Sequence, residues 1–326
     1  MLLAHDAADG RGSRMRAVQN TDDGICVVDA PEPDGPGIVV EPRTVGICGS
    51  DLHVLGLGGK GLTFGHEIGA LLDGRAVAIQ PFPFCGSCEQ CARSIPHLCV
   101  STRSSLLGMQ CNGGMAERLV VDPSCLVELP AGMDTATAAL VEPIAVAVHA
   151  LGLAALSPGM RVAVIGGGTV GQVTGAAALL AGVTVDIATR HAAQHACAEK
   201  LGLGRAPTKG YDVVFDAAGT ESSLAAAVRA VRPGGTIVAP GIYWSDVTLP
   251  GFAVCLKEIR ILPSIYYGMQ DGRREIDIAA ELLPRIPGLA DAIVSHRFPL
   301  ERAAEAFATA ASREAGAIKV VVDIEA

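Results

Sequence analysis

The chain has 326 residues, of which 50% are hydrophobic and 18% are charged, so it can bury a sizeable core and is not globally disordered. The net charge of −9, without a run of Lys and Arg, argues against a nucleic-acid-binding surface. The longest apolar runs, near 143–156 and 170–185, are short for a bilayer and interrupted by polar residues, so we expect buried helices there.

Residues 1–14 are polar, and no apolar segment of signal-peptide length follows a basic start. We expect a loose extension before a domain that begins near Met15. Ten cysteines without a secretory signal favour reduced thiols and metal binding over disulfides. The expected compartment is therefore the cytoplasm.

Residues 15–45 alternate apolar and polar side chains in short segments separated by prolines, which predicts strands and turns. Two glycine-bracketed stretches follow, and together they contain Cys48, Ser50, Asp51, His53, His66 and Glu67. Thiolate, imidazole and carboxylate are zinc ligands, and a hydroxyl with a second imidazole can move a proton. Each residue alone would more often be an ordinary core or turn residue, but together they predict the wall of a catalytic zinc site.

A second cluster consists of cysteines in a Pro- and Gly-rich loop. Its members are Cys85, Cys88, Cys91 and Cys99. Cys-x-x-Cys spacing can close a tetrahedral thiolate cage without long-range folding. The alternatives are a coincidental spacing or a pair of disulfides, and adjacent Cys-x-x-Cys spacing in an acidic chain from a reducing compartment argues against both. Four thiolates leave no open coordination position, so we predict a structural zinc ion.

These motifs, in this order, resemble the zinc-dependent medium-chain alcohol and polyol dehydrogenases from about Met15 to the C-terminus. The resemblance implies an α/β fold with a β-rich, GroES-like catalytic domain (1–143 and 271–326) and a Rossmann domain with a doubly wound parallel sheet (144–270). It also implies two zinc ions per chain and a nicotinamide cofactor.

The resemblance makes Cys48 and His66 ligands of the catalytic zinc. The third protein ligand in the family is a Cys, Asp or Glu just before the cofactor domain, and Glu142 occupies that position here. A Glu-Pro pair at this point is similar to the polyol, butanediol and glucose dehydrogenase branches. Glu67 is an alternative ligand that could exchange with water or with Glu142.

The remaining side chains of the first cluster receive supporting roles by the same resemblance. Asp51 would orient a zinc ligand, Ser50 would hydrogen-bond the substrate hydroxyl, and His53 would pass the proton onward. One departure from the family lies between Glu67 and Cys85, where the chain is shorter and Asp73-Gly74 predicts a tight hairpin turn.

A dinucleotide-binding pattern begins after the apolar segment 161–165. It is a G-x-G-x-x-G motif made of Gly166, Gly168, Thr169, Val170 and Gly171, followed by an Ala-rich helical stretch over 172–180 and a second predicted strand over 183–188. Glycines there let backbone amides approach a pyrophosphate at the helix N-terminus.

Residues at the end of that second strand bind the adenosine ribose of the cofactor in this type of domain, so they indicate whether the cofactor is NAD or NADP. Asp186 has the spacing of an NAD ribose ligand but lies within the strand, while Thr189, Arg190 and His191 occupy the strand's end. A cationic side chain there suits a 2′-phosphate, so we favour NADP over NAD.

Further strands are predicted near 211–216, 231–239 and 258–265, alternating with helices as in a parallel sheet. The resemblance places the nicotinamide near Ala218, Pro240, Gly241 and Ile265, and it implies a homodimer or homotetramer formed through edge strands. After 270 the chain returns to the first domain as a helix, a strand, an amphipathic helix and a final strand over 319–324.

The sequence therefore predicts hydride transfer between an alcohol or polyol, or the matching carbonyl, and NAD(P). The alternatives are a non-catalytic NADP-binding zinc protein and a zinc-free enone or quinone reductase. Candidate substrate-pocket residues are mostly apolar or aromatic and hint at a substrate larger or less polar than ethanol; they are Leu57, Met109, Tyr243, Trp244 and Tyr267.

Overall fold

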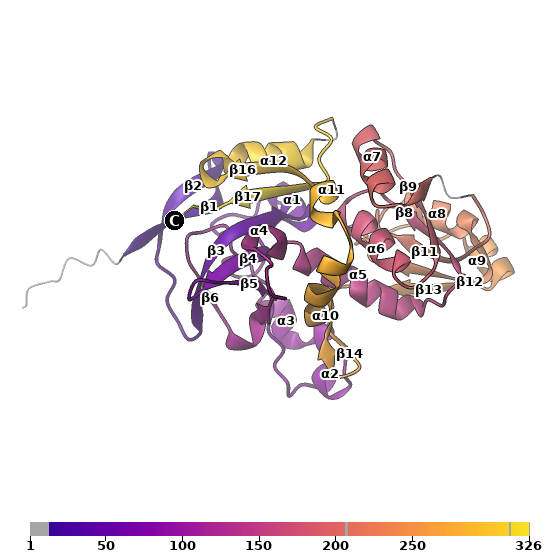
Figure 1. Ribbon diagram of the computed structural model, residues 1–326, viewed down its shortest axis with the longest axis horizontal. Coiled ribbons are helices and arrows are strands. Elements are labelled where there is room, and N and C mark those ends of the chain that lie inside the picture. Colours follow the sequence, from indigo (N-terminus) through magenta and orange to yellow (C-terminus); the bar gives the residue numbers. More distant parts are fainter. Residues whose placement is uncertain (1–12, 206–207, 313, 326) are drawn as a thin grey trace, which may run out of the picture.

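A computed structural model describes residues 13–205, 208–312 and 314–325 and shows two β-sheets at opposite ends of an elongated molecule (Figure 1). The predicted N-terminal extension falls mostly on residues 1–12, outside the described residues. Strand β1 already begins at Arg14, however, so that residue is part of the fold rather than of an extension.

The first sheet is a mixed sheet of order β16-β17-β3-β4-β5-β7, joined by β6 and accompanied by the β1–β2 hairpin. Its strands are β3 (Ile38–Ile47), β4 (Glu67–Leu72), β5 (Arg75–Ile79), β6 (Leu119–Val121), β7 (Leu126–Glu128), β16 (Val294–Pro299) and β17 (Lys319–Asp323), and the separate hairpin consists of β1 (Arg14–Thr21) and β2 (Gly24–Pro31). Because β17 pairs with β3, the end of the chain completes the sheet that its beginning starts.

Short helices surround this sheet. They are α1 (Gly49–Gly56), α2 (Glu89–Ala92), η1 (Pro96–Leu98), α3 (Val100–Ser104), η2 (Pro123–Cys125), α4 (Thr135–Ala138), α10 (Glu275–Leu282), η3 (Leu283–Arg285), α11 (Leu289–Ile293), η4 (Leu300–Arg302) and α12 (Ala303–Ala311). A two-residue ribbon of β14 (Met269–Gln270) and β15 (Arg273–Arg274) precedes α10.

The predicted tight turn joins β4 to β5. Leu72 pairs with Arg75, and both Asp73 and Gly74 have positive φ, as a two-residue type I′ hairpin requires. The glycine-containing segment 113–121 predicts a return strand from its sequence, but only β6 is a strand there. Gly114 and Met115 before it donate backbone hydrogen bonds to the segment that precedes β4.

The second sheet has six parallel strands in the order β10-β9-β8-β11-β12-β13. They are β8 (Arg161–Ile165), β9 (Thr184–Ala188), β10 (Gly204–Arg205), β11 (Tyr211–Asp216), β12 (Val231–Ala239) and β13 (Arg260–Pro263), with helices α6 (Thr169–Leu179), α7 (Ala192–Lys200), α8 (Glu221–Ala230) and α9 (Gly251–Lys257). In chain order this is 3-2-1-4-5-6, the dinucleotide-binding arrangement, which reverses direction between β8 and β11.

The two sheets are linked by α5 (Val141–Ala154), which packs against α6 and α10. The Ala-rich, helix-periodic sequence from 133 to 155 predicts one helix, but the structure has α4 and α5 with a break between them. The stretch Thr135–Ala154 is long and apolar enough to cross a membrane, but 61% of its most apolar part is buried inside the protein. It therefore serves as a core helix, as its apolar sequence predicts.

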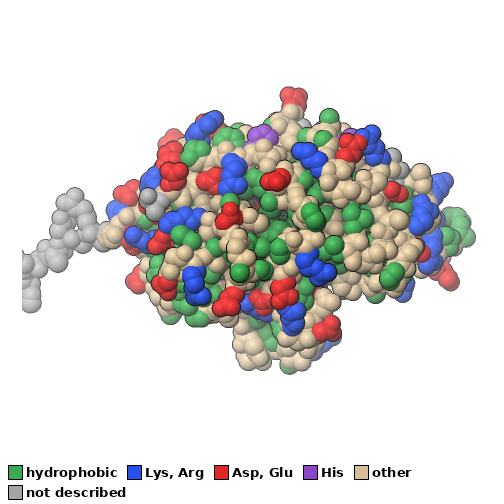
Figure 2. All heavy atoms as spheres, in the orientation of Figure 1, with side chains coloured by type: hydrophobic (Ala, Val, Ile, Leu, Met, Phe, Trp, Pro, Cys, Tyr) green, Lys and Arg blue, Asp and Glu red, His purple; other side chains and the backbone are tan. Residues whose placement is uncertain are grey.

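Charged side chains are mixed over the face drawn in Figure 2, where Lys and Arg alternate with Asp and Glu. That face has no basic block, which agrees with the sequence-based exclusion of a nucleic-acid surface.

Candidate active site and metal sites

A cavity of about 400 Å³ lies between the two sheets. One wall consists of the segments that follow β11, β12 and β13, where parallel sheets of this order bind their ligands. The opposite wall consists of the turn between β3 and α1, the start of β4, and the first two turns of α5.

Three potential metal ligands meet on that opposite wall. One ligand atom each from Cys48, His66 and Glu67 lie within 4.8 Å of one another. Strand pairing brings them together, because β3 runs antiparallel to β4 with Gly46 opposite Glu67. A Cβ on Gly46 would lie 2.0 Å from Glu67 Oε2, so only glycine leaves room for this carboxylate.

Asp51 and Ser50 hold the imidazole of His66 from two sides. Asp51 is fully buried in the first turn of α1, accepts a hydrogen bond of 2.8 Å from the Cys48 amide, and places Oδ1 3.3 Å from His66 Nδ1. Ser50 Oγ lies 3.3 Å from His66 Nε2. A carboxylate on one ring nitrogen leaves the other free for a metal, which is how zinc-bound histidines are oriented.

The sequence interpretation missed the partner of Glu67. Lys319 at the start of β17 is buried, donates to Glu67 Oε1 at 2.6 Å and to the carbonyl of Ile47 at 3.0 Å. Burial favours the neutral amine, but Glu67 and the Cys48 thiolate raise the pKa of Lys319, so it stays charged. A single lysine in an otherwise apolar strand, Lys319-Val-Val-Val, was the available signal.

Glu142 lines the same cavity from the first turn of α5 but is not part of the close three-residue cluster. Burial raises the pKa of Glu142 to about 7; the His66 imidazole opposes that rise and the Glu67 carboxylate adds to it. Glu67 is thus near the other ligands but paired with Lys319, whereas Glu142 lies outside the close cluster, and both His66 and Lys319 oppose the rise of its pKa. Either carboxylate can complete the ligand set.

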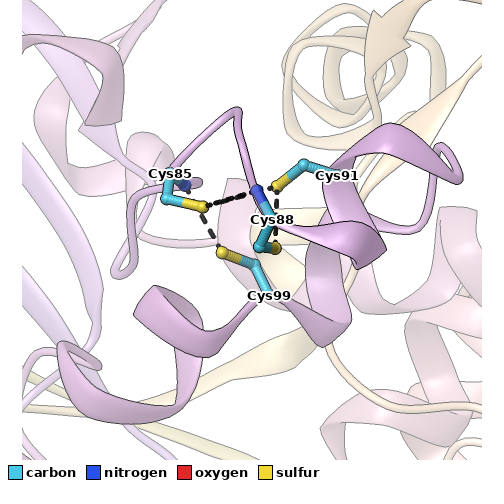
Figure 3. A group of neighbouring side chains, drawn as sticks. All are labelled: Cys85, Cys88, Cys91 and Cys99. Atoms are coloured by element: carbon cyan, nitrogen blue, oxygen red, sulfur yellow. Dashed lines mark hydrogen bonds between the residues drawn. The ribbon is translucent and has the colours of Figure 1, made fainter.

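The four cysteines form a separate lobe, in which their side chains gather around one point (Figure 3). Cys88 Sγ lies 3.6 Å from Cys91 Sγ, and Cys85 Sγ lies 4.0 Å from Cys91 Sγ. These separations bracket the roughly 3.8 Å between sulfurs around a tetrahedral zinc ion and are far longer than a disulfide bond. All ten cysteines are free thiols.

Backbone amides in the lobe point at sulfur. The Cys88 amide donates to Cys85 Sγ at 3.3 Å, and the amides of Cys85 and Ser101 donate to Cys99 Sγ. Such hydrogen bonds from Ser87 and Cys88 lower the pKa of the Cys85 thiol to about 6. Burial, with the neighbouring Cys88 thiol, instead raises the pKa of the Cys91 thiol to about 12. Without a metal the lobe therefore favours the thiolate, the form that binds zinc, at Cys85 but not at Cys91.

The G-x-G-x-x-G motif forms the turn from β8 into α6, which begins at Thr169, three residues earlier than predicted. A Cβ on Gly171 would lie 1.9 Å from the Gly166 carbonyl oxygen, so the motif needs glycine there. Gly168, the residue before the helix, has open space around it. Val170 lines the cavity, whereas the Thr169 hydroxyl donates a hydrogen bond to the Ile318 carbonyl.

Within β9, Asp186 accepts a hydrogen bond of 2.5 Å from the Tyr211 hydroxyl. Thr189 Oγ1 lies 2.7 Å from His195 Nδ1, and His191 precedes α7. Arg190 is exposed, and its guanidinium reaches Ser222 Oγ at 3.4 Å. The strand's end thus presents a cation and no carboxylate of its own.

Comparisons with known proteins agree with this geometry. Residues 35–131 match the alcohol dehydrogenase GroES-like domain, and residues 169–283 match the zinc-binding dehydrogenase domain. A probable D-xylulose reductase A of Arthroderma otae is 30% identical over 313 residues, which cover 81% of this chain and 88% of the relative. D-xylulose reductase A of Aspergillus oryzae is 29% identical and covers 82% and 86%.

The chain belongs to the zinc-dependent medium-chain alcohol and polyol dehydrogenase family.

Solved structures give the same result for the fold of this dehydrogenase. A zinc-binding dehydrogenase from Sinorhizobium meliloti 1021 bound to NADP superimposes with a TM-score of 0.83 at 28% identity, covering 95% of this chain and 99% of that one. Galactitol-1-phosphate dehydrogenase from Escherichia coli gives 0.84 at 25% identity, covering 95% and 100%. The predicted two-part fold of a GroES-like β-rich region and a Rossmann sheet is confirmed.

The residues present fit the groups that this family uses. The sulfur of Cys48, a ring nitrogen of His66 and a carboxylate oxygen of Glu67 converge beside the cavity, and the lobe supplies four cysteine sulfurs. The turn before α6 has open space at Gly168, where a pyrophosphate could approach the backbone. The dehydrogenase is thus an NAD(P)-dependent oxidoreductase with zinc ligands. The assembled ligand clusters are not those of a zinc-free enone or quinone reductase.

The remaining predicted site residues divide into two groups. Ser50, Ala218, Gly241 and Ile265 line the cavity of the dehydrogenase, as do Met109 and Trp244. His53 does not line the cavity; its ring stacks on Trp244 with the ring centroids 3.7 Å apart. The other pocket candidates are placed elsewhere: Leu57 is 75% exposed, Tyr243 donates to Asp216, and Tyr267 is fully buried beside Glu142.

Proposed function

We propose that this dehydrogenase is a zinc enzyme that transfers a hydride between the carbinol carbon of an alcohol or polyol and NADP. The observation that carries the proposal is the convergence of three features on one cavity. The Cys48, His66 and Glu67 cluster, the Ser50 hydroxyl and the segments after β11, β12 and β13 all line it. The D-xylulose reductase relatives make a polyol or a ketose one substrate class to test.

When bound, zinc withdraws electron density from the substrate oxygen, and the nicotinamide accepts the hydride. In the oxidation, the C–H and O–H bonds of the alcohol break and a C=O bond forms. The C–H electron pair leaves with the hydride and the proton goes to solvent. Ser50, beside His66, is placed to take that proton first.

The outward path of the proton is part of the proposal. His53 lies three residues after Ser50, about one helical turn along α1, so the two side chains share a face. Asp51 keeps the imidazole of His66 oriented throughout the reaction, because its carboxylate is fixed by the Cys48 amide.

The test is His66→Ala. Loss of a metal that stabilises the substrate oxygen by several kcal/mol should lower kcat at least about a thousandfold. Circular dichroism should stay unchanged, and NADP binding, measured by calorimetry, should persist because α6 and the Rossmann sheet are untouched. Unchanged turnover by His66→Ala would remove the catalytic-zinc assignment.

NADP preference is a second, separable part of the proposal, supported by the exposed Arg190 at the end of β9 and by the diversion of Asp186 to Tyr211. Arg190→Ala should lower kcat/KM for NADP about ten- to hundredfold, the value of a charge-assisted hydrogen bond, and change that for NAD little. Equal losses with both cofactors would show that Arg190 does not read the 2′-phosphate.

A cytoplasmic location and a homo-oligomeric assembly remain part of the proposal. Ten free thiols suit a reducing compartment. β13 is the outer strand of its sheet and offers an open edge to a second copy, although Pro263 removes one donor from it.

A further inference from the structure

The cavity lining is mostly apolar or aromatic. Its large apolar and aromatic side chains are Phe82, Leu106, Met109, Pro143, Val146, Trp244 and Tyr266, the last two from the segments that follow β12 and β13. Among the described residues that line the cavity, the carboxylates are Glu67 and Glu142 at the ligand end, and no Lys, Arg, Asp, Asn or Gln is present. The hydroxyl groups beyond Ser50 are those of Thr220, Ser264 and Tyr266, so a sugar alcohol would find few partners for its row of hydroxyls.

This composition has a consequence for specificity. A hydroxyl group that enters an apolar pocket without a partner loses its hydrogen bonds to water, which lowers affinity roughly five- to hundredfold for each group. An apolar ring in the same place gains from burial instead. The wall therefore selects against a chain of hydroxyls and for a hydrophobic substituent.

Trp244 is a wall residue that joins the two halves of the protein, as Tyr266 does through its contact with Phe82. It lies between β12 and α9, and its ring stacks on His53 of α1 at an interplanar angle of 19°. The stack holds the indole in place, yet 49% of the Trp244 surface stays exposed. The indole thus offers a fixed, partly exposed aromatic surface to the cavity.

Resting on the proposed function, we propose that the substrate is a secondary alcohol or ketone with an aryl or similarly flat apolar group beside the carbinol carbon. That group packs against Trp244 and the wall of Phe82, Leu106 and Met109. Trp244 is then a specificity-determining residue: it contacts the apolar substituent, while Ser50 serves the hydroxyl. The reaction with 1-phenylethanol is balanced by NADP, which receives the hydride as acetophenone forms and a proton is released.

The first test measures binding without turnover. Trp244 is the single tryptophan of the chain, so tryptophan-selective fluorescence reports on this wall alone. Acetophenone with oxidised NADP cannot react, and titrating it into the zinc-loaded enzyme should give saturable quenching. Xylulose at the same concentrations should give none. Quenching that rises linearly without saturation would mean collision only and would count against the inference.

The second test compares substrates by kcat/KM with NADP. The enzyme should oxidise 1-phenylethanol at least about tenfold more efficiently than xylitol. Trp244→Ala should lower the ratio of 1-phenylethanol to 2-propanol efficiency about tenfold, mostly through KM, and Trp244→Phe should retain most of that ratio. Phe252→Ala, an exposed aromatic change on α9 outside the cavity lining, is the matched control and should leave the ratio unchanged.

The outcomes separate this inference from the function on which it rests. A preference for xylitol, or a ratio unaffected by Trp244→Ala, would overturn the aryl assignment while leaving the zinc dehydrogenase activity in place. Turnover of none of the three alcohols would overturn the proposed function and this inference with it.

Discussion

The cysteine lobe and the catalytic cluster lie in the same half of the molecule, yet they are assembled differently. The lobe's four thiols come from one loop, residues 85–99, and are partly exposed; only Cys99 is buried. The catalytic cluster draws on β3, β4 and β17, and its His66, Glu67 and Lys319 are all buried.

The difference teaches where each site obtains its rigidity. The lobe is held by local amide-to-sulfur hydrogen bonds and needs little help from the rest of the fold. The catalytic cluster depends on strand pairing and on a buried ion pair, so it should be far more sensitive to a change in its surroundings. Five variants test this contrast, beginning with the largest expected effect.

Lys319→Met should destabilise the protein by about 3–5 kcal/mol, because it leaves the Glu67 carboxylate buried without its cation. The free energy of unfolding in urea is the measurement. Arg93→Met removes the exposed Arg93–Glu89 pair of the lobe, 3.5 Å apart, and should cost less than about 1 kcal/mol. Similar losses for the two variants would contradict the contrast.

The double variant Glu67→Gln/Lys319→Met makes the comparison sharper. Removing both charges should recover part of the stability lost in Lys319→Met, because no unpaired charge then remains buried. If the double variant is less stable than the single one, Glu67 has a stabilising partner other than Lys319.

Cys88→Ser should affect the lobe alone. It removes one of four thiolates, so we expect loss of one zinc ion per chain and a thermal midpoint lower by a few degrees. Turnover should stay within about tenfold of the unchanged enzyme, since the cavity lining contains none of the lobe's cysteines. Abolished turnover with intact circular dichroism would show that the lobe acts on the catalytic site.

His97 of the lobe should give the smallest effect, a dependence on pH. Burial, with the neighbouring His149, lowers the pKa of His97 to about 4 from the ordinary 6.5. As the pH falls, the imidazole of His97 is therefore protonated in the unfolded chain before it is protonated in the folded protein. The free energy of unfolding decreases as the pH falls from about 6.5 towards 4. Glu275, which accepts from His149 and from the Gly268 amide, partly opposes the shift.

His97→Gln should remove about 1 kcal/mol of the difference in unfolding free energy between pH 7 and pH 5, after allowance for partial exposure of the ring. The measurement is urea unfolding of both proteins at the two pH values. If the unfolding free energies of the two proteins change equally between the two pH values, the low pKa of His97 does not contribute to the pH dependence of stability.

The same contrast explains what could be predicted from the sequence. The lobe was predictable because its ligands and its turns lie within one loop. The parallel sheet of the Rossmann domain was predictable from alternating strands and helices and the glycine motif at 166–171, but its strand order was not predicted. Lys319 was not predictable in the same way, because it meets Glu67 across 252 residues of chain and only strand pairing connects them.

Aromatic contacts between the halves were likewise beyond the sequence. Of the five predicted pocket residues, Met109 and Trp244 line the cavity and the other three do not, since a loop aromatic can point inward or outward at the same sequence position. The stacking of Trp244 on His53 depends on how the two halves sit against each other, which no local pattern encodes.

The most direct test of the account counts zinc beside turnover. We predict about two zinc ions per chain in the unchanged enzyme, and about one in either His66→Ala or Cys88→Ser. Only His66→Ala should lose NADP-dependent alcohol oxidation. An unchanged zinc content in His66→Ala, or full turnover after its zinc is lost, would contradict a catalytic zinc site at Cys48 and His66.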